Sequence, residues 1–149
     1  MTTPWHSDPQ LSIARERALA SDWSGVRELL ATAAVESSPA EAKLLLAEAE
    51  LRLGEARLAG NQLRPIADSL ERSGDRAALG RAMNLLGAAL FELGELDDAE
   101  SAFGRALQVA SQDDDAVLIA RATNNLGAIA NVRGQRESAL ALYQIAVPA

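Results

Sequence analysis

Two pairs of side chains with the same chemistry lie 40 residues apart in the sequence. Arg81 and Asn84 recur as Arg121 and Asn124. A carboxamide donates and accepts hydrogen bonds at once, so the asparagines could pair with the amide and carbonyl groups of an extended peptide. A guanidinium group can hold a carboxylate through two parallel hydrogen bonds. The two pairs therefore predict a surface that binds a peptide segment.

Each pair belongs to a longer stripe, because residues three and four apart lie on one face of a helix. The complete candidate groove consists of Arg81, Asn84, Ala88, Phe91, Arg121, Asn124, Ala128 and Asn131. Helices that pack about 8 to 10 Å apart would place equivalent side chains about three extended residues apart. One peptide could then bridge both stripes. The matching upstream stripe lacks this character and consists of Glu41, Leu44, Glu48 and Leu51.

A simpler interpretation of the same residues stays open. The two arginines could pair with acidic neighbours on a solvated face, an arrangement worth less than about 1 kcal/mol for each pair. The asparagines could be ordinary surface residues of a helix. Phe91 is either an anchor in the groove or a member of the hydrophobic core.

The composition leaves little material for catalysis or for binding a metal or cofactor. The chain has no cysteine and a single histidine, His6, which excludes thiolate chemistry, paired catalytic histidines and histidine metal clusters. The run Asp113-Asp114-Asp115 lacks the spacing, the glycine and the closing glutamate of a calcium loop. No Gly-Lys-Ser or Gly-Lys-Thr phosphate loop occurs. We expect a protein that is not an enzyme and that has no cofactor and no metal.

Charge and hydropathy restrict the partners. The 14 basic and 21 acidic residues give a net charge of −7, which provides no general attraction to nucleic acid or to anionic membranes. No apolar segment approaches the roughly 18 residues of a membrane span, and residues 1–10 have no signal-peptide core. We expect a cytoplasmic protein that binds a protein or peptide, without direct contact to nucleic acid or membrane.

The elements that would position the groove residues are helices, and they repeat. The chain is 48% hydrophobic but only 3% aromatic, and its 31 alanines favour closely packed helices. Self-similarity at one period indicates a repeat architecture. A shift of 40 residues superposes Ala42, Ala82 and Ala122; Leu46, Leu86 and Leu126; Gly54, Gly94 and Gly134; and Ala59, Ala99 and Ala139.

Each repeat is predicted to contain two helices separated by a glycine. In the clearest copy, Asp75 caps a helix over 76–93, Gly94 ends it, and a second helix covers 96 to about 111. In the next copy, Asp114 or Asp115 caps a helix that runs to 133, and its partner covers 136–147.

The upstream copy departs from this plan in its second helix. A helix start is predicted at Ser38, with Pro39 in the first turn and Glu41 completing a capping box. Proline inside a helix costs about 3 kcal/mol or forces a kink. We therefore expect the second helix, which contains Pro65, to bend or restart near Arg64.

Two strings of residues carry a family resemblance. They are Asn84-Leu85-Leu86-Gly87 with Gly94, Ala99, Phe103 and Ala106, and Asn125-Leu126-Gly127 with Gly134, Ala139, Tyr143 and Ala146. They resemble tetratricopeptide repeats, and the period resembles the 40-residue branch of kinesin light chain, Leu-Gly-Asn repeat proteins and bacterial peptide-sensing regulators. The resemblance implies an all-α fold, a right-handed superhelical solenoid of about four antiparallel helix pairs whose first helices line a concave groove. Similar proteins use groove asparagines and arginines to hold peptides.

The boundaries predict a single domain over 1–149. A degenerate N-terminal pair, with helices over 11–20 and 24–35, occupies 10–36, and three repeats follow at 39–74, 75–113 and 114–149. Trp5 is a candidate cover for the N-terminal end. The packing residues predicted at the close-contact positions are Gly87 and Gly127, with Phe103 and Tyr143 filling the gaps beside them.

The last helix is predicted to present an uncovered apolar face made of Ala139, Leu142, Tyr143 and Ala146. Such an end is a pairing surface, so we expect either a piece of a longer array or a homodimer joined end to end. Two functions follow as hypotheses. The first is a non-catalytic scaffold that binds an extended segment in its groove. The alternative is a sensor or oligomerisation fragment of a larger bacterial transcriptional regulator.

Overall fold

The computed structural model describes residues 9–31 and 39–146, and within these ranges every regular element is a helix. The elements in chain order are α1 (Pro9–Leu19), α2 (Trp23–Leu30), α3 (Ala40–Arg52), α4 (Ala56–Ser73), α5 (Arg76–Glu92), α6 (Leu96–Gln112), α7 (Ala116–Val132) and α8 (Arg136–Ala146). None of the described helices is long and apolar enough to cross a membrane.

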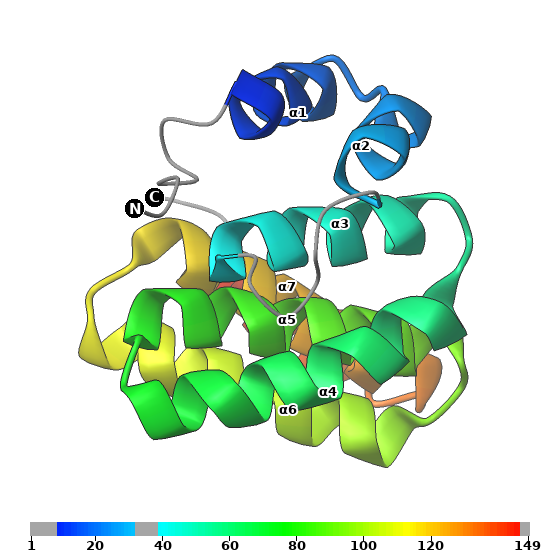
Figure 1. Ribbon diagram of the computed structural model, residues 1–149. Coiled ribbons are helices and arrows are strands. Elements are labelled where there is room, and N and C mark those ends of the chain that lie inside the picture. Colours follow the sequence, from blue (N-terminus) through cyan, green and yellow to red (C-terminus); the bar gives the residue numbers. More distant parts are fainter. Residues whose placement is uncertain (1–8, 32–38, 147–149) are drawn as a thin grey trace.

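The helices form pairs that stack along the chain. Each helix packs against the next one in sequence, and the first helices of successive pairs also touch, α1 with α3, α3 with α5 and α5 with α7 (Figure 1). This arrangement confirms the predicted all-α solenoid of about four helix pairs. The right-handed sense of its superhelix stays a prediction.

Glycine ends the first helix of three successive pairs, as predicted. Gly94 follows α5 with φ of +79°, a conformation that only glycine adopts without strain. Its N–H donates to the carbonyl of Phe91 at 3.0 Å, and the N–H of Glu95 donates to that of Leu90 at 2.9 Å. Gly54 and Gly134 have the same left-handed backbone. These bonds satisfy carbonyls at the helix end and turn the chain sharply into the second helix.

Aspartates cap the two helices that carry the candidate groove residues. The Asp75 side chain accepts a hydrogen bond from the Ala78 N–H at 3.2 Å, and that of Asp115 accepts one from the Leu118 N–H at 3.1 Å. Asp115 is therefore the cap of α7, which decides between the two predicted candidates. Both caps satisfy amides that have no partner inside the helix.

The predicted capping box at the start of α3 is wrong. Pro39 is itself the N-cap and provides no side-chain hydrogen bond, while Ser38 lies outside the described residues. Glu41 reaches away from its own helix and forms an ion pair with Arg15 of α1, with 3.1 Å between Arg15 Nε and Glu41 Oε2. The Glu41 carboxylate, which the sequence pattern assigned to the helix cap, thus pairs with an arginine of a neighbouring helix.

The predicted restart of the helix near Arg64 is also wrong, because α4 continues through Pro65, and the predicted bend stays a prediction. Pro65 is exposed, whereas Leu63 and Ala67 beside it are buried, so the ring faces solvent. The carbonyl that loses its amide partner belongs to Asn61, which is exposed too. Water can replace the lost hydrogen bond on this side of the helix.

The helices of the N-terminal pair have other boundaries than predicted. Trp23, expected in the connection, is the first residue of α2, and Asp22 caps this helix by accepting a hydrogen bond from the Gly25 N–H at 3.0 Å. Helix α2 ends at Leu30, whereas the predicted helix ran to residue 35. Residues 32–35 lie outside the described residues. The prediction for Trp5 lies outside them as well.

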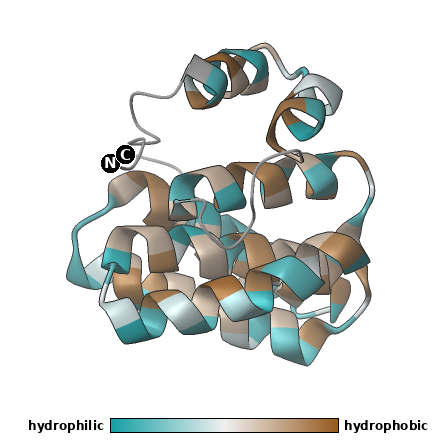
Figure 2. Ribbon diagram, in the orientation of Figure 1, coloured by the Kyte–Doolittle hydropathy of each residue, from teal (hydrophilic) through white to brown (hydrophobic). Residues whose placement is uncertain are grey.

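Hydrophobic and hydrophilic residues alternate along the helix ribbons (Figure 2), and the buried hydrophobic residues form two clusters. The main cluster extends from α3 to α7 and includes Leu44, Leu63, Leu86, Phe103 and Ile129. A smaller cluster joins α1 and α2 to the other side of α3. The core is therefore elongated and passes from one helix pair to the next, as repeat stacking requires.

Candidate peptide-binding groove

The first helices α3, α5 and α7 line a cavity of about 530 Å³. Five of the eight predicted groove residues lie on its wall, namely Arg81, Asn84, Ala88, Arg121 and Asn124. The other lining residues are Glu48, Leu51, Arg52, Leu85, Glu92, Leu118 and Asn125. A cavity of this size is typical of ligand sites in proteins.

Helical periodicity places the five predicted residues in the cavity. On α5 the buried residues Ala82, Leu86 and Ala89 face the main cluster. Arg81, Asn84 and Ala88 are three and four residues apart, so they share a different face of the helix. Helices α5 and α7 each begin one residue after their capping aspartate, Asp75 or Asp115. Arg121 therefore has the same position within α7 as Arg81 has within α5.

Three predicted residues do not line the cavity. Phe91 is half-buried and packs against the main hydrophobic cluster, which is the core alternative left open for this residue. Ala128 is half-buried, and Asn131 is exposed near the end of α7. The stripe therefore contributes its first two turns to the cavity, and its last turn lies beyond the wall.

A hydrogen bond joins the asparagines of neighbouring repeats. The Nδ2 amide of Asn125 donates to Oδ1 of Asn84 at 3.0 Å, so α7 is linked to α5 across the floor of the cavity. The sequence analysis treated Asn124 as the equivalent of Asn84, and Asn124 lines the cavity as well. The signal for Asn125 was its place directly before Leu126-Gly127 in the string that carries the family resemblance.

Arg81 and Arg121 of the cavity wall have no acidic partner among the described residues. Arg81 and Arg121 are both exposed, and neither forms an ion pair or hydrogen bond with another described residue. The alternative in which they pair with acidic neighbours is therefore not what the described residues show. With Arg52, Glu48 and Glu92 also in the lining, the cavity carries a formal excess of one positive charge in a chain of net charge −7.

Three further charged residues of the cavity were not among the predicted site. Arg52 forms an ion pair with Glu48 at 3.6 Å and lies 5.3 Å from the centre of the Trp23 ring. Glu92 is exposed at the end of α5. Arg52 was not predicted because it follows the weakly matching upstream stripe by one residue and its neighbour Trp23 comes from a distant helix.

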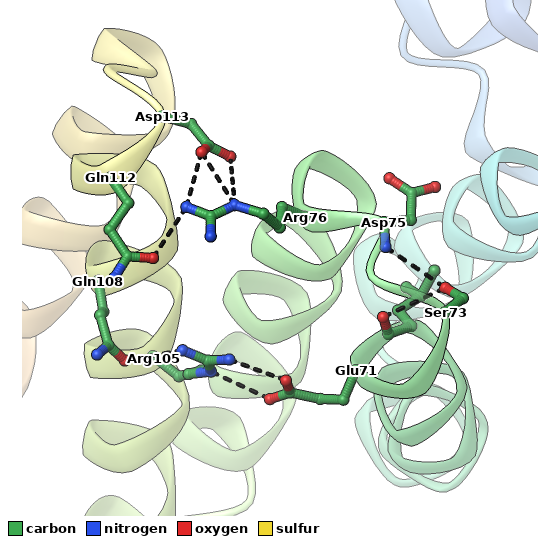
Figure 3. Close-up of polar contacts among 9 residues, drawn as sticks. Glu71, Ser73, Asp75, Arg76, Arg105, Gln108, Gln112 and Asp113 are labelled. Atoms are coloured by element: carbon green, nitrogen blue, oxygen red, sulfur yellow. Dashed lines mark hydrogen bonds and ion pairs between the residues drawn. The ribbon is translucent and has the colours of Figure 1, made fainter.

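Arginines elsewhere on the array are paired with polar or acidic residues of another helix. Arg76 contacts Asp113 and Gln112 at 2.8 and 2.9 Å, and Arg105 holds Glu71 through two hydrogen bonds of 2.8 and 3.0 Å (Figure 3). The hydrogen bonds from Arg105 lower the pKa of Glu71. Arg76 thus joins the two helices of one pair and Arg105 joins two successive pairs, whereas Arg81 and Arg121 form no hydrogen bond with another described residue.

The comparison with known proteins agrees with the residues that carry the resemblance. The tetratricopeptide repeat family model matches residues 79–149. These residues are tetratricopeptide repeats. The match begins in α5 and includes all five predicted groove residues that lie on the cavity wall, Arg81, Asn84, Ala88, Arg121 and Asn124. The 40-residue branch of the family stays a prediction.

One solved structure, titled "MamA MSR-1 C2", aligns with 92% of this chain and 92% of its own, at 17% identity and a TM-score of 0.40. A similarity this distant adds nothing to the argument for the tetratricopeptide assignment. No curated protein matches the sequence.

Proposed function

We propose that this tetratricopeptide protein is a non-catalytic scaffold that binds an extended peptide or protein segment in the cavity formed by α3, α5 and α7. Tetratricopeptide repeats are protein interaction modules, which supports the general role. The observation that carries the specific proposal is the position of Arg81 and Arg121. Both line one cavity, and neither has a counter-ion among the described residues.

The asparagine pair would hold the peptide backbone. Because Asn84 accepts from Asn125 through its oxygen, its own Nδ2 hydrogens remain available as donors. The oxygen of Asn125 remains available as an acceptor. The linked pair thus offers both a donor and an acceptor, the combination that a peptide group requires. Because these groups would bind only the peptide backbone, they would not select a particular sequence.

The arginines would select a segment that carries carboxylates. A guanidinium group binds a carboxylate through two parallel hydrogen bonds, and two such groups in one cavity favour two acidic side chains or a chain terminus. The whole protein is negatively charged, so long-range repulsion would oppose an acidic partner while the cavity attracts it locally. Removal of these two arginines should therefore weaken binding far more than the same change of net charge made elsewhere on the surface.

The test compares two libraries of fluorescein-labelled ten-residue peptides by fluorescence anisotropy. In one library two aspartates stand three residues apart, and in the other asparagines replace them. We expect acidic peptides to be selected, and the Arg81→Gln, Arg121→Gln double variant to lose at least tenfold in affinity for them. The matched control is Arg57→Gln, Arg72→Gln on α4, where both arginines are exposed and away from the cavity.

Equal affinity of the cavity variant and the wild type for the selected peptides would contradict the proposal. Equal affinity of the wild type for the neutral and the acidic peptides would contradict it as well. A similar loss in the α4 control would show that total charge, and not the cavity, determines binding.

A second proposal concerns the outer face of α8, which we infer to join two copies of this chain. Leu140 and Ile145 are exposed large hydrophobic residues, and Leu142 and Tyr143 beside them are only half-buried. Exposed apolar patches favour association. Light scattering should show a dimer that Ile145→Ser dissociates, and a monomeric wild type at high concentration would rule it out.

The remaining hypotheses have no specific support in the described residues. These are the sensor or oligomerisation fragment of a larger bacterial transcriptional regulator, and the cytoplasmic location. They stay predictions.

A further inference from the structure

The charged residues of the cavity wall lie at its two ends, because the helices that carry them run in one direction. From α3 to α7 each helix is joined to the next by two or three residues, so consecutive helices are antiparallel. Arg76, which begins α5, contacts Asp113 directly after α6 (Figure 3). Arg133, directly after α7, contacts Asp97 near the start of α6. Helices α3, α5 and α7 are therefore parallel, and their first turns lie at the same end of the cavity.

The end of the cavity at the helix starts is cationic. Arg81 and Arg121 lie in the second turn of α5 and of α7, and neither has a counter-ion among the described residues. About one turn further along, Asn125 donates its hydrogen bond to Asn84. A ligand carboxylate bound by the arginines would therefore be followed by backbone that passes over these amides toward the other end.

The opposite end of the cavity carries an excess of negative charge. Glu92 is the last residue of α5, Arg52 is the last residue of α3, and Glu48 lies one turn before Arg52. Arg52 pairs with Glu48 at 3.6 Å and lies 5.3 Å from the centre of the Trp23 ring. Glu92 is exposed and has no ion pair or hydrogen bond with any residue in the described part of the chain. The one carboxylate of the lining that is left without a cation is thus that of Glu92, as far as the described residues show.

Glu92 also occupies a position where its own helix disfavours a carboxylate. The carbonyl groups at the C-terminal end of a helix carry partial negative charge. Helix α5 has no basic residue in its last turn that would offset this charge. A carboxylate there destabilises the helix slightly, and a cation bound beside it would remove the cost. Helix stability therefore does not account for Glu92, whereas a basic group of a ligand would.

The distance between the two ends suits a short extended segment. Arg81 and Glu92 are 11 residues apart on α5. This separation is three helical turns to within about 20° of rotation, so both residues lie on one face of the helix. Along the axis they are about 16 Å apart, which an extended peptide spans in about five residues.

We propose that the cavity selects a bipolar segment, in which acidic residues bind Arg81 and Arg121 and a basic residue about five positions away binds Glu92. The inference rests on the proposed peptide binding and deepens it by naming a second chemical group of the ligand. Glu92 is then a specificity-determining residue: it distinguishes a segment with charges of both signs from one that is acidic throughout.

Three fluorescein-labelled peptide sets, measured by fluorescence anisotropy, test this selection. All carry the two aspartates described above. The first has a lysine five residues beyond them, on either side so that both chain directions are sampled; the second has glutamine there; the third has the lysine directly beside an aspartate. The first set should bind about threefold more tightly than the others, the effect of one solvated ion pair. The third set has the same net charge as the first, so it controls for general attraction of lysine to an acidic protein.

Substitutions at Glu92 should change this preference in a defined way. Glu92→Gln should remove the advantage of the first set and keep the affinity for acidic peptides. Glu92→Lys should reverse it, so that aspartate at the distant position is preferred to lysine. Glu137→Gln, exposed on α8, is the matched control and should behave like the wild type. Glu92→Gln should not lower the midpoint of thermal unfolding, because the carboxylate is disfavoured at this helix end.

An advantage of the first set that survives Glu92→Gln would overturn the proposal, as would lysine acting equally well directly beside an aspartate. A lower unfolding midpoint in Glu92→Gln would show a structural role and would contradict it too. Acidic peptides that bind through Arg81 and Arg121 without any effect of lysine would overturn this inference and leave the proposed function standing. Absence of binding by every peptide would overturn both.

Discussion

In each of the last two repeats an aromatic ring packs against a glycine, and the two rings are buried to different extents. In the third pair Phe103 of α6 packs against Gly87 of α5, and in the fourth Tyr143 of α8 packs against Gly127 of α7. A Cβ atom added at either glycine would lie 2.6 Å from the aromatic ring. Yet Phe103 is 1% exposed, whereas Tyr143 is only half-buried.

The difference arises from the following helix. Helix α7 packs on α6, where Ala102 and Ala106 are buried. The equivalent residues of α8, Leu142 and Ala146, are half-buried, and no described helix follows α8. Burial in a repeat array is thus set by the neighbouring unit as much as by the residue itself. The same contact between ring and glycine should stabilise the interior pair more than the last described pair.

The largest expected effect is the loss of the interior ring. Phe103→Ala should lower the free energy of unfolding by about 3 to 5 kcal/mol, because the cavity it leaves is enclosed on all sides. Tyr143→Ala should cost clearly less, since α8 can close over the gap. Urea unfolding followed by circular dichroism measures both. Equal losses would break the comparison between the two pairs.

A smaller effect is expected when this contact is crowded from the glycine side. Gly87→Ala forces a methyl group against the buried ring of Phe103 and should cost about 1 to 3 kcal/mol by overpacking. Gly127→Ala meets a ring on an outer helix that can shift, so its cost should lie below that of Gly87→Ala. Thermal unfolding of the two variants side by side decides the order, and a larger loss for Gly127→Ala would reverse our interpretation.

The smallest effect is expected at the surface of the two pairs. Arg105 on α6 holds Glu71, whereas the equivalent residue of α8 is the exposed Ile145. Arg105→Ala should destabilise the fold only slightly, because the pair is solvated, and added salt should reduce the loss.

The pH dependence of this loss has a definite sign. The pKa of Glu71 is lowered by Arg105, so the stabilisation is present above the ordinary glutamate value and disappears as the pH falls through the lowered one. Urea unfolding of the wild type and Arg105→Ala at several pH values should therefore converge in acid. A difference that grows on acidification would contradict this assignment.

Local patterns accounted for much of the fold and part of the groove. The turn glycines, the aspartate caps of α5 and α7 and the two-helix repeat were all predicted correctly, because each depends on residues within a few positions of one another. The placement of Arg81 and Asn84 on one face followed from helical periodicity for the same reason. What failed at α3 was also local: Glu41 satisfied the pattern of a capping box but found Arg15 on another helix.

By itself, then, the sequence determined that the chain is an array of helix pairs and which helix faces could meet a ligand, since short-range hydrogen bonding and periodicity dictate both. Only the tertiary structure decided which side chains meet between helices. It linked Asn84 to Asn125, turned Phe91 to the core and buried Glu50 against α4. These outcomes depend on the distances and rotations between helices, and such contacts join residues that no local pattern relates.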